Sequence, residues 1–174
     1  MKNKFIQSHL KAAEVYAKLS SAHRLKVGCV IVKNDTIIGI GYNGMPAGWD
    51  NNCEDKRYDS GAGGWISPEE FYEQYPYKEM HGEFQDQEVR YGLKTKPEVL
   101  HAESNAIAKV AKSTNSSEGA AMFITHAPCI DCSKLIHQAG ISSVYYRNTY
   151  RSEEGLQFLE KCGVKTELVW NPNT

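Results

Sequence analysis

Two short stretches, His101-Ala102-Glu103-Ser104-Asn105 and Pro128-Cys129-Ile130-Asp131-Cys132, carry the strongest pattern in this chain of 174 residues. The first opens a helix-like run over residues 102–112, and the second opens another over residues 129–139. An apolar, strand-like segment, residues 121–125, lies between them. The two cysteines are three residues apart and share one helix face, and the proline suits a first turn, where a missing N–H costs nothing. The stretches therefore predict a helix–strand–helix unit with one histidine and two cysteines near helix starts.

His101, Cys129 and Cys132 form a potential set of metal ligands. One imidazole and two thiolates give three ligands to tetrahedral Zn²⁺ and leave the fourth position open for water, whose pKa then falls from about 15.7 to near 7. Glu103 is close enough in sequence to take a proton from that water. Because residues two apart do not face the same point in a regular helix, we expect His101 in the turn that leads into the helix.

Together the stretches match the pattern H-x-E…P-C-x-x-C, which is typical of zinc-dependent deaminases. In such an enzyme Glu103 would pass its proton to a ring nitrogen and then to the departing ammonia. A lone C-x-x-C also occurs in redox pairs and in halves of structural zinc sites. A structural site normally has a fourth protein ligand and needs no proton shuttle. Since no fourth ligand is evident and Glu103 is present, the pattern favours a catalytic zinc.

Composition restricts the setting and the partners. The formal net charge is −1 and the calculated pI is about 6.6, which disfavours broad electrostatic binding to nucleic acid. No apolar stretch approaches the roughly 20 residues that span a bilayer, so no membrane association is expected. Five cysteines, an odd number, fit metal-binding thiols in a reducing compartment better than disulfides. We therefore expect a cytoplasmic protein, in the host cytoplasm if it is viral.

The remaining segments predict an α/β protein. Residues 39–48, dense in glycine and proline, predict a loop whose backbone N–H groups can approach a ligand. Residues 49–97 are polar, aromatic and irregular, with one helix from Ser67 to about Tyr75. Alternating strands and helices imply helices on both faces of a mixed sheet. The other predicted elements are an amphipathic helix over 5–17, a hairpin over 27–40 with a turn at Asn34-Asp35, strands over 143–146 and 165–169, and a helix over 151–162.

Most of the chain resembles the deoxycytidylate (dCMP) deaminases. The zinc motifs are common to the whole cytidine deaminase superfamily, whereas Gly-Tyr-Asn-Gly-x-Pro at residues 41–46 and the long insertion before His101 are similar to dCMP deaminases in particular. The resemblance implies a single catalytic domain over residues 1–174 with an irregular insertion at about 44–97. It also implies a three-layer α/β/α cytidine-deaminase-like fold with a mixed five-stranded sheet. Other stretches that carry it are Val27-Gly28, residues 134–136 and residues 138–141.

The resemblance further implies an activity and its control. The expected reaction is zinc-dependent hydrolysis of dCMP to dUMP and ammonia, which supplies dUMP for thymidylate synthesis within pyrimidine deoxyribonucleotide synthesis. The expected assembly is a homohexamer. Its expected effectors are dCTP with Mg²⁺, which activates, and dTTP, which inhibits.

Candidate residues follow for each role. Glu103 is the catalytic residue, and Asn43 is expected to hydrogen-bond the sugar. Arg24 and Lys26 precede the first predicted strand and could hold the 5′-phosphate, although a single cation of this kind is more often a solvated surface charge. Tyr150 matches the family's tyrosine after a strand. The candidate regulatory nucleotide site is the loop Asn43, Gly44, Met45, Pro46, Ala47 and Gly48.

Cys53 raises the question of a second metal, because some viral members of the family carry a structural zinc held by cysteines and paired histidines. Ser20 and Ser21 stand where such a site would need a cysteine, and His81 is the only histidine of the insertion. We therefore predict that Cys53 binds no metal and that each chain holds one zinc.

Two rival functions stay open at this stage. One is a deaminase for a different substrate: a free base, a nucleoside or a tRNA adenosine. The other is a non-catalytic, zinc-stabilised module that senses dCTP and dTTP. His126 could be a wall of the substrate pocket, a residue that supports the zinc ligands without binding the metal, or a histidine that faces solvent.

Overall fold

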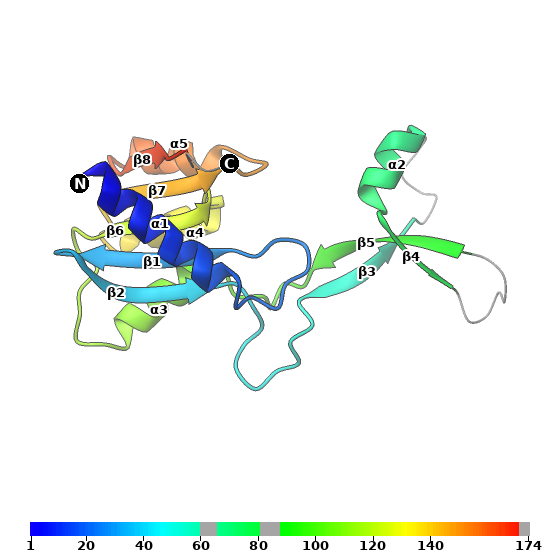
Figure 1. The fold of residues 1–174 in the computed structure, drawn as a ribbon, viewed down its shortest axis with the longest axis horizontal. Helices are drawn as coiled ribbons and strands as arrows, with labels where there is room; N and C mark the ends of the chain where they lie inside the picture. The colour runs from blue at the N-terminus through cyan, green and yellow to red at the C-terminus, as the bar shows by residue number, and fades with distance from the viewer. Residues whose placement is uncertain (60–65, 81–87, 171–174) are drawn as a thin grey trace.

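The computed structural model describes residues 1–59, 66–80 and 88–170 (Figure 1). The helices and strands agree with the predicted order outside the insertion. They are α1 (Asn3–Ala17), β1 (Gly28–Lys33), β2 (Thr36–Tyr42), β3 (Glu54–Tyr58), α2 (Pro68–Gln74), β4 (Tyr77–Met80), β5 (Glu88–Thr95), α3 (Ala102–Ala111), β6 (Ala121–His126), α4 (Ile130–Gln138), β7 (Ser143–Asn148), α5 (Glu154–Lys161) and β8 (Lys165–Leu168).

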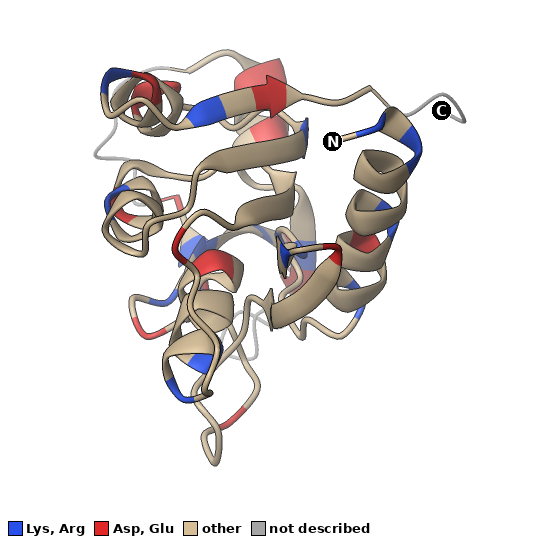
Figure 2. Cartoon of the chain, turned by 90° about the vertical axis from the view of Figure 1, so that its left-hand side faces the viewer, with Lys and Arg blue, Asp and Glu red and all other residues tan. Residues whose placement is uncertain are grey.

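A five-stranded sheet in the order β2-β1-β6-β7-β8 forms the centre of the body. The pairs β2/β1 and β1/β6 are antiparallel, whereas β6/β7 and β7/β8 are parallel. Helix α1 covers one face of this sheet, and α3, α4 and α5 cover the other (Figures 1 and 2). The predicted three-layer α/β/α fold with a mixed five-stranded sheet is confirmed.

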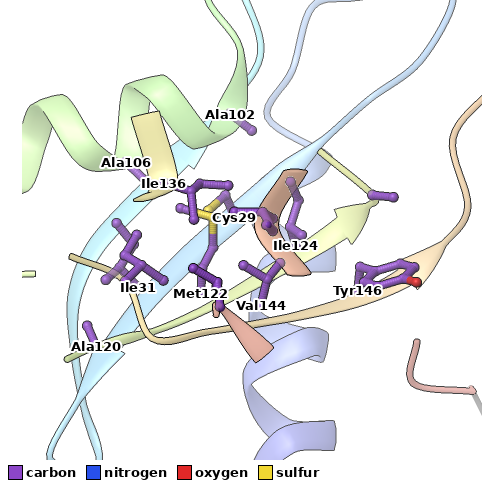
Figure 3. Packing of buried hydrophobic residues seen from close by; sticks show 14 of the residues in the cluster. Cys29, Ile31, Ala102, Ala106, Ala120, Met122, Ile124, Ile136, Val144 and Tyr146 are labelled. Atoms are coloured by element: carbon purple, nitrogen blue, oxygen red, sulfur yellow. The ribbon is translucent and has the colours of Figure 1, made fainter. Parts of the chain in front are cut away.

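Both faces of the sheet are packed with apolar side chains. On the face under α3, α4 and α5, strand residues such as Met122 and Ile124 contact Ala106 and Ile136 of the helices (Figure 3). On the opposite face Leu10 of α1 packs in a second cluster with strand residues of β1, β6 and β7. The long apolar side chains at these positions are almost completely buried. Removing their apolar surface from water is the main contribution to the free energy of folding of such a domain.

The β1–β2 hairpin turns at Asn34 and Asp35, whose φ angles are 50° and 60°, as a two-residue turn of the primed type requires. The predicted loop over residues 39–48 is wrong in its first part, because β2 continues to Tyr42. A Cβ on Gly41 would lie 1.9 Å from the backbone oxygen of Ala102. The glycine therefore lets the start of α3 approach the sheet, and its role is packing instead of ligand contact.

The insertion is not irregular, which corrects the prediction for residues 49–97. β3, β5 and β4 form a second, antiparallel sheet in that order, and Arg90 of β5 lies over the ring of Tyr72 in α2. We call these four elements the arm. Ser67 and Glu70 form a capping box at the start of α2, as its sequence predicts. The arm projects from the body in Figure 1, and its first and last paired residues, Glu54 and Thr95, lie at its root.

The described surface mixes both signs of charge. In Figure 2, lysine and arginine (blue) and aspartate and glutamate (red) are both scattered over the helices and strands. Within the described ranges, no helix combines the length and apolar character needed to cross a membrane. All five cysteines are free thiols.

Candidate active site

The start of α3 and the start of α4 bring the three predicted metal ligands together. His101 is the N-cap residue of α3 and Cys129 is the N-cap residue of α4, while Cys132 lies in the first turn of α4. Pro128 precedes the N-cap, so it lies just outside the first turn in which we expected it. Because His101 has extended backbone angles, φ −77° and ψ 155°, it occupies the turn before the helix as predicted.

The geometry of this group fits a zinc ion. Nδ1 of His101 lies 3.2 Å from Sγ of Cys132 and 3.6 Å from Sγ of Cys129. The three ligand atoms lie within 4.8 Å of one another. With Zn–S bonds of about 2.3 Å and Zn–N bonds of about 2.0–2.1 Å, a tetrahedral ion separates such ligands by roughly 3.5 Å. In the described part of the chain this is the group of three His, Cys, Asp or Glu residues that could hold a metal, and it contains no fourth protein ligand.

The pKa values of the two thiols shift in opposite directions. A hydrogen bond from Cys132 lowers the pKa of Cys129 to about 4, and a hydrogen bond with His101 adds to this effect. The same hydrogen bond to Cys129, together with burial, raises the pKa of Cys132. The N-terminus of α4 also favours a thiolate at this position. Binding a divalent cation here would release the remaining thiol proton.

Glu103 is buried beside these ligands. Its exposed fraction is 4%, and it lies in the first turn of α3. Burial raises the pKa of its carboxyl, and the nearby His101 opposes that rise. A raised pKa brings a carboxyl closer to neutral pH, which suits a group that must both accept and donate a proton.

A cavity of about 290 Å³ opens next to the ligand group and Glu103. Three of the four predicted substrate residues line it, namely Arg24, Asn43 and Tyr150, whereas the exposed Lys26 does not. His126 is half-buried in its wall. Sequence reasoning missed several other lining residues, which come from distant segments and belong to no motif: Glu54, Thr95, Val99 and Arg151.

Asn43 is held rigidly at the edge of this cavity. Its Oδ1 accepts a hydrogen bond from the Val27 amide, and its Nδ2 donates one to the Leu25 carbonyl, both at 2.8 Å. The side chain thereby fixes the segment that follows Arg24. One amide hydrogen and one oxygen lone pair remain for a ligand.

A second cavity, of about 630 Å³, lies on the other side of Asn43. The loop residues predicted for the regulatory nucleotide, 43–48, all line it. Lys109 and Lys112 of α3 add two cationic side chains, and Trp49 adds an aromatic ring. The structure thus brings the predicted loop residues together around one hollow.

Cys53 is fully buried and belongs to no group of three potential metal ligands within the described residues. Its Sγ lies 3.3 Å from the hydroxyl oxygen of Ser21 and 3.6 Å from the Asn51 carbonyl. A serine therefore occupies the position next to Cys53 where a second thiolate would be needed. His81 lies outside the described residues.

The sheet, the His/Cys/Cys group at two helix starts and the buried Glu103 define a zinc-dependent deaminase. The family model described as the cytidine and deoxycytidylate deaminase zinc-binding region matches residues 3–148. The chain belongs to this family, and it is a deaminase.

Individual relatives agree with this assignment. The chain is 34% identical to the deoxycytidylate deaminase of Enterobacteria phage T4, over 81% of the chain and 76% of the phage protein. It is 32% identical to the deoxycytidylate deaminase of Homo sapiens, over 79% of the chain and 61% of the human protein. The crystal structure of dCMP deaminase from cyanophage S-TIM5, in complex with dCMP and dUMP, superposes with a TM-score of 0.72 at 37% identity, covering 97% of this chain and 99% of the other. The predicted family is confirmed.

Proposed function

We propose that this chain catalyses the hydrolytic deamination of dCMP to dUMP and ammonia, as one catalytic domain over residues 1–174. The observation that carries this proposal is a single cavity that is lined both by His101, Cys129 and Glu103 and by two arginines, Arg24 and Arg151. The residues suited to deamination and two cations suited to an anion therefore line the same cavity. The relative of known structure that binds dCMP and dUMP supports the same substrate.

The ligand group and Glu103 divide the chemistry between them. His101, Cys129 and Cys132 would hold one zinc ion, which supplies Lewis-acid activation of water when bound. Glu103 accepts one proton of the attacking water and delivers it to the pyrimidine ring nitrogen N3. It then accepts the second proton from the same oxygen and delivers it to the amine, which leaves as ammonia. Its burial excludes bulk water from this proton path. The family resemblance is consistent with a cytoplasmic enzyme that supplies dUMP for thymidylate synthesis.

The nucleotide would lie between the ligand group and the arginines. A guanidinium binds a phosphate through paired hydrogen bonds, so Arg24 and Arg151 suit the 5′-phosphate. Asn43 retains hydrogen-bonding capacity for the sugar, and Tyr150 lines the same wall. Lys26 is outside the cavity and has no role in this arrangement.

The test compares kcat/KM for dCMP, CMP, deoxycytidine and cytosine. We expect dCMP to exceed deoxycytidine by at least about a hundredfold, because a hydrogen bond to a charged group is worth about 1.5–3 kcal/mol and the phosphate makes several. Arg24→Gln should reduce this preference by about tenfold or more. Lys26→Gln, an exposed cation outside the cavity, is the matched control and should leave it unchanged. Equal values for dCMP and deoxycytidine in the unmodified enzyme would make it a nucleoside deaminase.

The second cavity is the proposed site of a regulatory nucleoside triphosphate with Mg²⁺. Lys109 and Lys112 suit the phosphates, and the glycine-spaced loop 43–48 offers backbone donors. Gly44 exchanges backbone hydrogen bonds with Leu100, at 3.1 and 2.9 Å, directly before His101. A ligand that moves this loop therefore moves a neighbour of the zinc ligand. The effectors dCTP and dTTP would act in opposite directions by favouring different states of a homohexamer.

Regulation is tested by the dCMP saturation curve. We expect dCTP with Mg²⁺ to make it hyperbolic and dTTP to make it more sigmoidal, with a coupling of about 1–3 kcal/mol. The double variant Lys109→Ala/Lys112→Ala should lose both responses, since the phosphates lose their cations, while its rate without effectors stays close to that of the unmodified enzyme. Lys134→Ala, an exposed lysine of α4 outside this cavity, is the control. Light scattering on the same samples should give the mass of six chains. Unchanged rates of the unmodified enzyme with either nucleotide would remove this part of the proposal.

A further inference from the structure

The root of the arm forms one wall of the substrate cavity. Glu54, the first residue of β3, pairs with Thr95, the last residue of β5. Both residues line the cavity next to Arg24. The sequence motifs and the proposed chemistry assign no role to either residue.

The carboxylate of Glu54 holds the backbone at Arg24. Its Oε1 accepts hydrogen bonds from the amides of His23 at 3.1 Å and of Arg24 at 3.2 Å, and its Oε2 lies 3.3 Å from the His23 amide. Glu54 is only 4% exposed. Because a buried carboxylate is costly unless it accepts hydrogen bonds, these amides and the carboxylate hold each other in place. The segment between α1 and β1 has no helix or strand at this point, so these hydrogen bonds take the place of regular structure.

The side chain of Thr95 holds the guanidinium of Arg24. Its Oγ1 accepts a hydrogen bond from Nη1 of Arg24 at 3.0 Å. A guanidinium has five N–H donors, so four remain available for an anion. Because the backbone and the guanidinium of Arg24 are both held, the side chain has less conformational freedom to lose when it binds an anion.

We propose that Glu54 and Thr95 are positioning residues that hold Arg24 ready for the 5′-phosphate of the substrate. The arm thereby sets the preference of the enzyme for a nucleotide over a nucleoside. This inference rests on the proposed function, in which dCMP is the substrate and Arg24 contacts its phosphate. It adds that two residues without phosphate contact control that preference through Arg24.

The test uses one disruptive and one conservative variant at each position. Thr95→Val has nearly the same shape but no acceptor for Arg24, whereas Thr95→Ser keeps the hydroxyl. Glu54→Ala removes both acceptor oxygens, whereas Glu54→Gln keeps one. For Thr95→Val and Glu54→Ala we expect KM for dCMP to rise about tenfold with kcat nearly unchanged, and kcat/KM for deoxycytidine to stay constant. Thr95→Ser and Glu54→Gln should resemble the unmodified enzyme, and zinc content should be the same in all four.

A double variant shows whether Thr95 acts through Arg24. Adding Thr95→Val to Arg24→Gln should cause no further loss with dCMP, because effects that pass through one residue are not additive. Equal losses with dCMP and deoxycytidine, or additive losses in the double variant, would overturn the positioning role. It would also be overturned if Arg24→Gln lost the preference for dCMP while Thr95→Val and Glu54→Ala kept it. If the unmodified enzyme showed no preference for dCMP, the proposed function would fail first, and this inference with it.

Discussion

Replacing Glu103 by glutamine is expected to lower kcat for dCMP at least about a thousandfold while zinc content stays at one per chain. Proton transfer by a positioned side chain contributes about 10²–10⁴-fold to a rate, and Glu103 serves more than one such step. The amide keeps the shape of the side chain but can neither accept nor deliver the proton. The three metal ligands are untouched.

The melting temperature of Glu103→Gln distinguishes a loss of catalysis from misfolding. Burial raises the pKa of Glu103, which means that the folded protein disfavours its charged form. A neutral glutamine should therefore leave the melting temperature equal or higher. Glu98→Gln, at an exposed position outside the cavity, is the matched control and should retain full activity. Full zinc content with near-normal turnover in Glu103→Gln would contradict the role assigned to this residue.

The second large effect is expected at the metal ligands. Cys132→Ala should reduce zinc content from one per chain to well below one and abolish measurable deamination, because two ligands bind zinc far more weakly than three. The melting temperature of Cys132→Ala should also be lower than that of the zinc-loaded unmodified protein, because the metal stabilises only the folded state and the variant no longer holds it. Elemental analysis, the rate with dCMP and a melting curve measure these three quantities.

Two other cysteines provide the controls. Cys162→Ser alters a half-buried thiol after α5 and should keep both zinc and activity. Cys53→Ser should also keep one zinc, because Ser21 occupies the place of a second thiolate. Stoichiometric zinc in Cys132→Ala would refute the assigned ligand set, and two zinc ions per unmodified chain would refute the prediction for Cys53.

The elements of the body could be predicted because their signals are local. Helix α1 has apolar residues at helical spacing, and the turn at Asn34 and Asp35 matches its residue types. The end of β2 could not be placed, since Gly39 and Gly41 read as loop residues. Their packing against α3 depends on contacts with Ala102, Ala106 and Val110, far along the chain, which local patterns do not contain.

The strands of the arm could not be predicted, for a related reason. β3 carries charged residues at four of its five positions, and β4 at two of its four, so neither has the apolar alternation of a buried strand. Aromatic side chains on neighbouring strands replace that signal: the ring of Tyr91 lies 6.0 Å from Tyr58 and 5.4 Å from Tyr77. Only the paired structure brings these rings together.

The candidate site also contains some residues that the sequence predicts and others that it does not. His101, Glu103, Cys129 and Cys132 belong to short motifs whose residue types suggest the chemistry, and the fold brings them together. Glu54 and Thr95 carry no such signal, because 40 residues of insertion separate them and their partner is the backbone and side chain of Arg24. Charge and a place just before the first strand favour Arg24 and Lys26 alike, but only Arg24 lines the cavity, because side-chain direction in a segment without regular structure cannot be read from the sequence.

The most direct test of the central claim is a time course with dCMP and the zinc-loaded protein, in which nucleotides and ammonia are quantified together. We expect one dUMP and one ammonia for each dCMP consumed, and no conversion by Glu103→Gln over the same period. Unchanged dCMP in the presence of protein that holds one zinc per chain would contradict the assignment.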